Sequence, residues 1–128
     1  MLFYTALTPE DRRRIGGAFL EIQFCRMPRG SALKDIVAVD SIKNRKSDSQ
    51  YVPDENEFCR IYDAILGHGC YNNLKSGPLD PYGINYYAPD TVGAIRERLR
   101  SAQPEEYAVF DAWLAQAEEC NGFYILGL

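Results

Sequence analysis

The sequence predicts an α+β fold: a single domain over residues 1–128, with four to five helices and a small sheet that includes the N- and C-terminal strands. Three observations predict it. Residues 54–66 place apolar side chains at helical spacing between a capping residue and two glycines, and residues 107–117 repeat the same spacing. Residues 2–7 and 123–128 are short apolar runs, which are typical of buried strands. A chain of 128 residues is long enough to bury its own core.

The composition excludes several classes of protein. Hydrophobic residues make up 46% and charged residues 25%, as in ordinary globular domains. No apolar run approaches the roughly 18–20 residues that a membrane span needs. The first residues lack a basic stretch before a long apolar one, so we expect no signal peptide and a cytoplasmic location. The four cysteines are scattered and His68 is the only histidine, so we expect neither a metal site nor a cofactor.

Charge is divided unevenly along the sequence. Residues 1–50 contain nine Lys and Arg against six Asp and Glu, and residues 51–128 contain five against twelve. The second part is therefore acidic, which can steer a basic protein partner. No basic stripe interleaved with aromatic residues occurs, so we expect no nucleic-acid partner.

The first part of the chain mixes clear and ambiguous signals. Residues 2–7 predict a strand, and Thr8 followed by Pro9 and two acids predicts the start of a helix. Because no residue between Gly17 and Glu21 requires a turn, we expect this helix to continue to Phe24. The alternation of Leu20, Ile22 and Phe24 leaves a strand as the alternative.

Residues 27–53 are expected to contain one helix and one loop. Ser31 can cap a helix that includes Leu33 and Ile36, although the β-branched run 36–39 leaves a strand as the alternative. Residues 44–53 are polar and without a period, which predicts an exposed loop. A basic cluster begins this loop, and such a cluster is typical of a solvated corner: Lys43, Arg45 and Lys46.

The second half contains the strongest helix signals. Asp54 and Glu57 form a capping box before the helix that ends at Gly67. A further helix is expected from Pro89, and another follows Pro104. Residues 123–128 then predict a buried strand that pairs with residues 2–7.

A long loop from Tyr71 to Tyr87 separates two of these helices. It contains four of the nine tyrosines, with three asparagines, two prolines and two glycines. Pro and Gly are too dense for a helix or a long strand, and loops of this length in compact domains are commonly functional. Tyr, Asn, Ser and Gly are the residues that binding loops use, whereas the alternative is that the tyrosines only cover the core.

Two resemblances bear on function. Residues 4–11, residues 82–92 with Ile95 and Leu99, and the apolar terminal strand together resemble the YfbM-like family of uncharacterised bacterial proteins. The resemblance covers about a third of the chain and implies no catalytic residues. A small acidic domain with aromatic loops also resembles, as a class, the immunity proteins that bacteria pair with secreted toxins.

We therefore expect a binding protein that neutralises a partner by occlusion, most simply an immunity protein against a cognate toxin, and not an enzyme. Tyrosines would act as anchors and acids would match basic residues of the partner. The predicted partner-binding residues are Asp54, Glu55, Tyr71, Asn72, Asp80, Tyr82, Asn85, Tyr86, Tyr87 and Asp90.

Two other functions remain open from the sequence. A small cytosolic enzyme could use His68 and Cys70, since an imidazole can lower the pKa of a neighbouring thiol. A homodimer could instead cover the 71–87 loop with a second copy of the chain.

Overall fold

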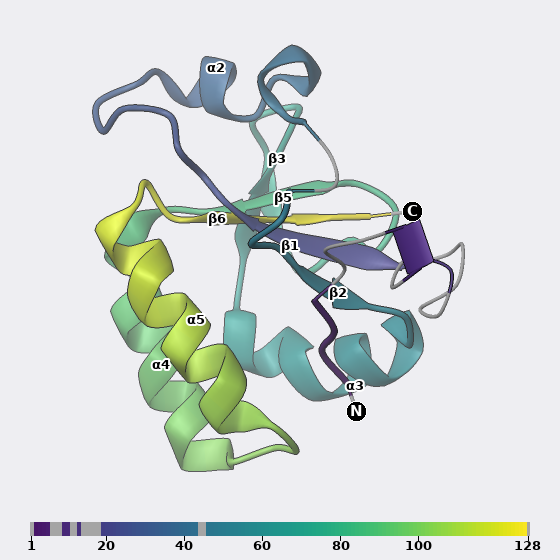
Figure 1. The fold of residues 1–128 in the computed structure, drawn as a ribbon. Helices are drawn as coiled ribbons and strands as arrows, with labels where there is room; N and C mark the ends of the chain where they lie inside the picture. Colours follow the sequence, from purple (N-terminus) through teal and green to yellow (C-terminus); the bar gives the residue numbers. More distant parts are fainter. Residues whose placement is uncertain (1, 6–8, 11–12, 14–18, 44–45, 128) are drawn as a thin grey trace.

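A six-stranded antiparallel sheet lies at the centre of the structure, in the order β2-β1-β6-β5-β3-β4 (Figure 1). The computed structural model describes residues 2–5, 9–10, 13, 19–43 and 46–127. The strands are β1 (Leu20–Phe24), β2 (Gln50–Val52), β3 (Gly69–Tyr71), β4 (Ser76–Gly77), β5 (Ile84–Tyr87) and β6 (Phe123–Leu126).

Three helices cover one face of this sheet (Figure 1). They are α3 (Glu55–Leu66), α4 (Pro89–Ala102) and α5 (Tyr107–Glu119). Alternate side chains of the strands point into this layer, so Leu20, Ile22 and Phe24 of β1 join the main core. Within that core the Phe24 and Trp113 rings stack with centroids 4.1 Å apart. The predicted α+β fold class is confirmed.

The opposite face is covered less completely. Among the described residues, the elements that lie over it are the short helix α2 (Leu33–Ile36), the 3₁₀ turn η1 (Val39–Ser41) and their connecting loops. A second, smaller cluster forms there, and its buried members are Cys25, Ile36, Val37, Tyr86, Tyr124 and Leu126. The sheet therefore has one face that stabilises the fold and a second face that is partly open.

Helix α3 begins and ends as predicted, and α4 begins at Pro89 as expected but extends to Ala102. Helix α5 begins at Tyr107 and not at Pro104, where its first turn was expected. The Asp54 side chain accepts a hydrogen bond from the Glu57 backbone N–H (3.1 Å), and Gly67 ends α3 with a φ of 68°. Residues Phe58, Tyr62, Ile65 and Leu66 form the buried side of α3. The buried residues of α4 are Val92, Ile95 and Leu99, which matches the expected apolar face.

The predicted continuous helix up to Phe24 is wrong, because residues Leu20–Phe24 form strand β1. All five side chains are buried, and the strand pairs with β2 on one side and β6 on the other. Paired neighbours on both sides outweigh the helical spacing of Ile22 and the residues before it. The short helix α2 does form, but Ala32 is its N-cap and Ser31 donates instead to the Pro28 carbonyl.

The segment predicted as an exposed loop, residues 44–53, contains strand β2. Tyr51 is fully buried, and its register opposite Glu21 places it on the second face of the sheet. Residues 44 and 45 lie outside the described residues. The polar residues before Tyr51 concealed the strand, and one of them, Ser49, is fully buried and donates to Glu21.

Residues 2–5, the described part of the expected strand 2–7, do not pair with β6. Tyr4 forms a single antiparallel bridge with Tyr51, through backbone hydrogen bonds of 2.9 and 2.7 Å. The position beside β6 belongs to β1 and β5. Leu2 and Phe3 are nevertheless buried in the main core. The cap Thr8 lies outside the described residues, whereas Pro9, Glu10 and Arg13 are helical.

A buried polar network holds Lys43, Lys46 and Ser49 against β1. The Glu21 oxygen Oε2 accepts hydrogen bonds from the Ser49 hydroxyl (2.7 Å), the Lys46 backbone N–H (3.0 Å) and the Gln23 amide (3.2 Å). The Gln23 amide also donates to the Lys43 carbonyl (2.9 Å). Glu21, Gln23 and Ser49 are each at most 3% exposed, so breaking these bonds would leave buried polar groups without partners.

Two pairs of buried tyrosines differ in their hydroxyl contacts. The Tyr86 hydroxyl donates to the Asn121 carbonyl (2.6 Å), and the Tyr124 hydroxyl donates to the Ile36 carbonyl (2.6 Å). The hydroxyls of Tyr62 and Tyr87 are buried with no hydrogen-bond partner among the described residues. Burial raises the pKa of all four phenols. No helix in the described part of the chain is both long and apolar enough to cross a membrane.

Removing single hydroxyl groups should affect stability differently in the two pairs of tyrosines. We expect Tyr86→Phe to lower the free energy of unfolding by about 1–2 kcal/mol, because the buried Asn121 carbonyl loses its donor. Tyr87→Phe should leave it within about 0.5 kcal/mol or raise it, because that hydroxyl has no partner to lose. Urea unfolding followed by far-UV circular dichroism measures both. Equal losses of unfolding free energy in the two variants would contradict the difference between the Tyr86 and Tyr87 hydroxyl contacts.

Alkaline pH should destabilise the fold. Above the ordinary tyrosine pKa of 10.0, the four phenols ionise in the unfolded chain while their raised pKa values keep them protonated in the folded one. The folded state then binds more protons, so the free energy of unfolding falls as pH rises, by up to about 1.4 kcal/mol per pH unit for each phenol. Urea unfolding between pH 8 and 11 tests this, and Tyr87→Phe should reduce the slope. An unchanged slope in that variant would count against the mechanism.

Candidate functional site

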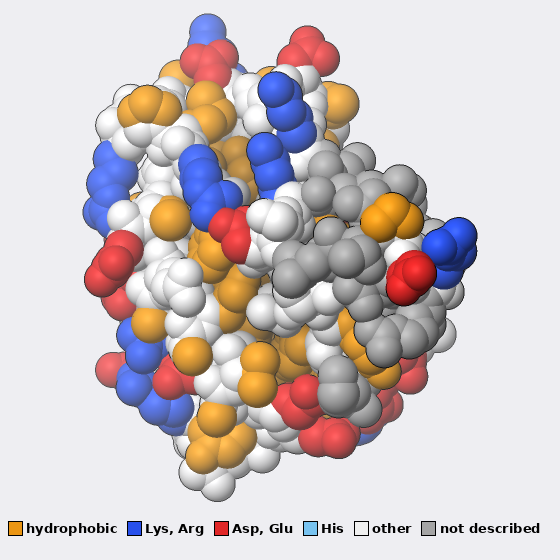
Figure 2. All heavy atoms as spheres, in the orientation of Figure 1, with side chains coloured by type: hydrophobic (Ala, Val, Ile, Leu, Met, Phe, Trp, Pro, Cys, Tyr) orange, Lys and Arg blue, Asp and Glu red, His pale blue; other side chains and the backbone are white. Residues whose placement is uncertain are grey.

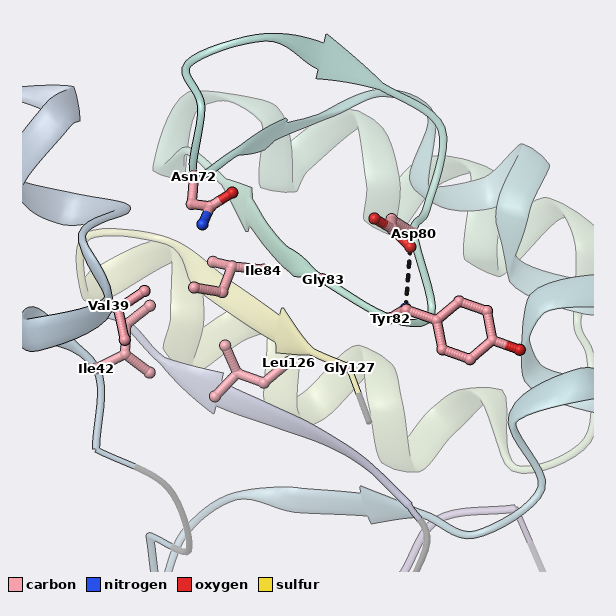
Figure 3. A pocket seen from close by; sticks show the side chains of 9 residues that line it. All are labelled: Val39, Ile42, Asn72, Asp80, Tyr82, Gly83, Ile84, Leu126 and Gly127. Atoms are coloured by element: carbon pink, nitrogen blue, oxygen red, sulfur yellow. Dashed lines mark hydrogen bonds between the residues drawn. The ribbon is translucent and has the colours of Figure 1, made fainter.

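A pocket of about 500 Å³ opens on the partly covered face of the sheet (Figure 3). It lies between η1, the turns that flank β4, and the adjacent ends of β5 and β6. We call it the Tyr82 pocket, and it is lined by Val39, Ile42, Asn72, Asp80, Tyr82, Gly83, Ile84, Leu126 and Gly127.

Aliphatic side chains form one side of the Tyr82 pocket. Ile84 and Leu126 are directly paired across β5 and β6, so their side chains emerge next to each other on the second face. Val39 and Ile42 approach them from the η1 segment, and Figure 3 shows the four side chains turned toward one another. Val39 is 64% exposed, which leaves an apolar surface open to solvent.

The opposite rim is a turn held by hydrogen bonds. The Asp80 carboxylate accepts from the Tyr82 backbone N–H (2.9 Å), and the Asp80 carbonyl accepts from the Gly83 N–H (3.4 Å). A Cβ atom at position 83 would lie 2.7 Å from the Asp80 carboxylate, so a larger residue here would force the Asp80 side chain to shift.

The Asn85 side chain holds the same turn through hydrogen bonds to the Asp80 backbone. Its side-chain carbonyl accepts from the Asp80 N–H (2.8 Å), and its amide donates to the carbonyls of Asp80 (2.8 Å) and Ile125 (3.0 Å). Because Asn85 is completely buried, these bonds are shielded from water. The turn thus presents Tyr82 in one conformation of its backbone.

Tyr82 is the most exposed large hydrophobic side chain among the described residues, at 72%. Its ring extends outward from the rim and away from the aliphatic side of the pocket (Figure 3). Asn72 lies across the opening on the β3–β4 turn, where Leu74 is 53% exposed. The structure therefore brings together three of the predicted partner-binding residues: Asn72, Asp80 and Tyr82.

Three other predicted contact residues are buried, which corrects their expected role. Tyr86 and Tyr87 are 3% and 1% exposed, and Asn85 is inaccessible. They belong to β5, whose two faces are both covered, so the side chains enter the clusters on either side of the sheet. Tyr87 stacks on Phe123 with ring centroids 4.8 Å apart. None of the three can reach a partner while the sheet is intact.

The remaining predicted residues lie away from the Tyr82 pocket. The Tyr71 hydroxyl donates to the Pro78 carbonyl and so supports the β3–β4 hairpin. Asp54 caps α3, and Glu55 follows it, on the helical side of the sheet. Asp90 belongs to the first turn of α4, where it lines a shallow depression with His68.

The aliphatic residues of the pocket were not predicted as site residues. In the sequence, Val39 and Leu126 belong to apolar runs that indicate core. Only the folded arrangement leaves Val39 exposed, because the short η1 turn does not cover the whole face. The polar residue next to Val39 in the sequence is Asp40, and an aspartate beside an apolar residue is too common to predict exposure.

The geometry around Cys70 does not favour a nucleophile. Its thiol is half-buried against the second cluster, and burial raises the pKa of the thiol, which opposes formation of the thiolate. His68 is exposed at the end of α3. All four cysteines are free, and the described residues include no group of three potential His, Cys, Asp or Glu metal ligands.

An isosteric substitution should show how much the rim depends on Asn85. We expect Asn85→Asp to lower the free energy of unfolding by about 3 kcal/mol or more, because a buried carboxylate would face two carbonyl oxygens that now accept from the amide. The same change at the exposed Asn72 serves as the control and should cost less than about 0.5 kcal/mol. Urea unfolding gives both values, and similar effects at the two positions would refute the role of Asn85.

Comparisons with protein-family models, with curated proteins and with solved structures found no match to this chain. The resemblance of residues 82–92 to the YfbM-like family therefore stays an expectation from the sequence. The same holds for the resemblance of class to immunity proteins.

Proposed function

We propose that this chain is a binding protein that captures a protein partner at the Tyr82 pocket and neutralises it by occlusion. The observation that supports this most directly is the exposure of Tyr82 on a turn fixed by Asp80 and Asn85. A large aromatic side chain that is exposed on an ordered backbone turn is typical of an interface anchor. Its exposure needs a reason, since most large aromatic side chains of this chain are buried.

The surroundings of Tyr82 suit such an interface. Val39 and Leu74 add exposed apolar surface, while Asn72 and Asp80 supply hydrogen-bonding groups at the rim. Interfaces commonly combine an apolar centre with a polar rim in this way. Because the turn is already ordered, binding would cost little conformational entropy.

The specific form of the proposal is an immunity protein that covers the working surface of a bacterial toxin. The acidic second half of the sequence supports it, since many surfaces that bind anionic substrates are basic and would attract such a partner. Asp80 is the acidic residue that the fold places at the pocket. Asp54, Glu55 and Asp90 lie outside it and would contribute to steering only.

Binding should depend on Tyr82. We expect Tyr82→Ala to weaken the complex by about 2 kcal/mol or more, roughly thirtyfold in Kd, because the anchor would be lost. The partner is first recovered by pull-down from a lysate of the native source, and its Kd for each purified variant is then measured by calorimetry. Stability should change by less than about 0.5 kcal/mol, because Tyr82 is exposed.

Val109→Ala is the matched control. Val109 is an exposed apolar residue on α5, in the helical layer on the other side of the sheet, so its truncation should leave the Kd unchanged. Equal Kd values for wild type and Tyr82→Ala would reject the Tyr82 pocket as the interface. A concentration-dependent mass that is lost in Tyr82→Ala would assign this surface to a homodimer instead.

A further inference from the structure

A second pocket, of about 400 Å³, opens on the same face of the sheet near the C-terminal end of β1. Three of the side chains that line it are cationic: Arg26, Lys43 and Lys46. We call it the basic pocket. Figure 2 shows Lys and Arg side chains close together in the upper half of the molecule. This concentration of positive charge contrasts with the net charge of −4 for the whole chain.

The two lysines are held at the pocket by buried side chains. The Lys43 carbonyl accepts from the Gln23 amide (2.9 Å), and the Lys46 backbone N–H donates to Glu21 (3.0 Å). The Lys46 carbonyl also accepts from the Tyr51 hydroxyl (2.9 Å). Because Glu21, Gln23 and Tyr51 belong to β1 and β2, the sheet itself sets the position of both lysines. The backbone at both lysines is therefore tied to the sheet, while their side chains are exposed.

Arg26 has two contacts that orient its exposed side chain. Its guanidinium forms an ion pair with Asp48 and lies 5.3 Å from the centre of the Phe24 ring. Asp48 is in turn held through its carbonyl, which accepts from the Trp113 indole N–H (3.0 Å). The carboxylate engages Nη1 and Nη2 of Arg26, and a guanidinium has five N–H donors in all. Donors therefore remain for a ligand.

The charge balance of the pocket indicates the kind of ligand. Asp48 neutralises Arg26, and the buried Glu21 carboxylate lies beside the pocket, where it accepts from the Gln23 amide and the Lys46 backbone N–H. Lys43 and Lys46 form no ion pair with a described residue, so their ammonium groups are available to a ligand. Two unpaired ammonium groups match a dianion better than a monoanion. A phosphate monoester has a charge of about −1.5 to −2 at pH 7, whereas a single carboxylate supplies only −1.

We propose that the basic pocket binds the phosphate monoester group of a small molecule. Lys43 and Lys46 contact the phosphate oxygens, and the Ser41 hydroxyl and the remaining Arg26 donors lie within the same lining. Met27 adds an apolar wall for the organic part of the ligand. A volume of about 400 Å³ falls within the range of roughly 300–1,000 Å³ found for small-molecule sites. This site is separate from the proposed protein interface and does not depend on it.

The test is calorimetric titration of the purified chain, at low ionic strength and without phosphate buffer, with AMP, adenosine and inorganic phosphate. We expect AMP to bind at least tenfold more tightly than adenosine, because only AMP has the phosphate. Lys43→Gln with Lys46→Gln should weaken AMP binding about tenfold per lysine. Tighter binding of AMP than of inorganic phosphate assigns an ester as the ligand, and equal binding assigns free phosphate; both support the phosphate site.

Lys75→Gln with Arg100→Gln is the control, because it removes the same charge at two exposed positions outside the pocket. It should leave AMP binding unchanged, and circular dichroism should show both double variants folded. The proposal is overturned if adenosine binds as well as AMP, if neither AMP nor phosphate binds, or if the two double variants lose equal affinity. Binding of single-stranded RNA that tightens steadily with its length would also overturn it, in favour of a nucleic-acid surface.

Discussion

Strand β6 lies in the middle of the sheet, where it pairs with β1 along one edge and with β5 along the other. It therefore joins two parts of the sheet that have no other strand in common: β2 with β1, and β5 with β3 and β4. Its side chains alternate between the two faces, so Phe123 and Ile125 enter the main core while Tyr124 and Leu126 enter the second cluster. Both candidate pockets depend on this strand, because Leu126 lines one and Tyr124 lines the other.

The two faces of the sheet differ in how completely they are covered. Three long helices bury the first face, and the stacked rings there account for much of the aromatic content of the chain. In the described part of the chain, the elements over the second face are short, and buried polar side chains of β1 hold the backbone of Lys43 and Lys46 beside them. Stability is thus concentrated on one side, and the accessible apolar and charged surfaces lie on the other.

Helix α3 could be predicted from the sequence because its cap, its period and its terminal glycine are all local signals. Strand β1 could not, because five consecutive buried residues have both helical and strand spacing until their partners are known. Strand β2 was hidden by polar neighbours such as Ser49, which looks like a loop residue but is fully buried against Glu21. In each failure, a contact between distant parts of the chain decided the structure.

The 71–87 region was identified as important, but its residues could not be ranked from the sequence. The sequence does not distinguish Tyr82 from Tyr86 and Tyr87. The pairing of β5 with β6 places Tyr86 and Tyr87 in the interior. Val39 and Ile42 line the Tyr82 pocket although they lie about forty residues earlier in the sequence, and no local sequence pattern predicts this contact. Similarly, Arg26 meets Lys43 and Lys46 only because the polar side chains of β1 hold the later segment in place.

The short segment from Val39 to Lys43 separates the two pockets: Val39 and Ile42 face the Tyr82 pocket, whereas Ser41 and Lys43 face the basic pocket. A ligand that moved this segment while binding on one side would therefore alter the affinity on the other. Thermodynamic linkage requires that any such effect be reciprocal, with the same factor in both directions. Any linkage between the two pockets would therefore pass through these five residues of backbone.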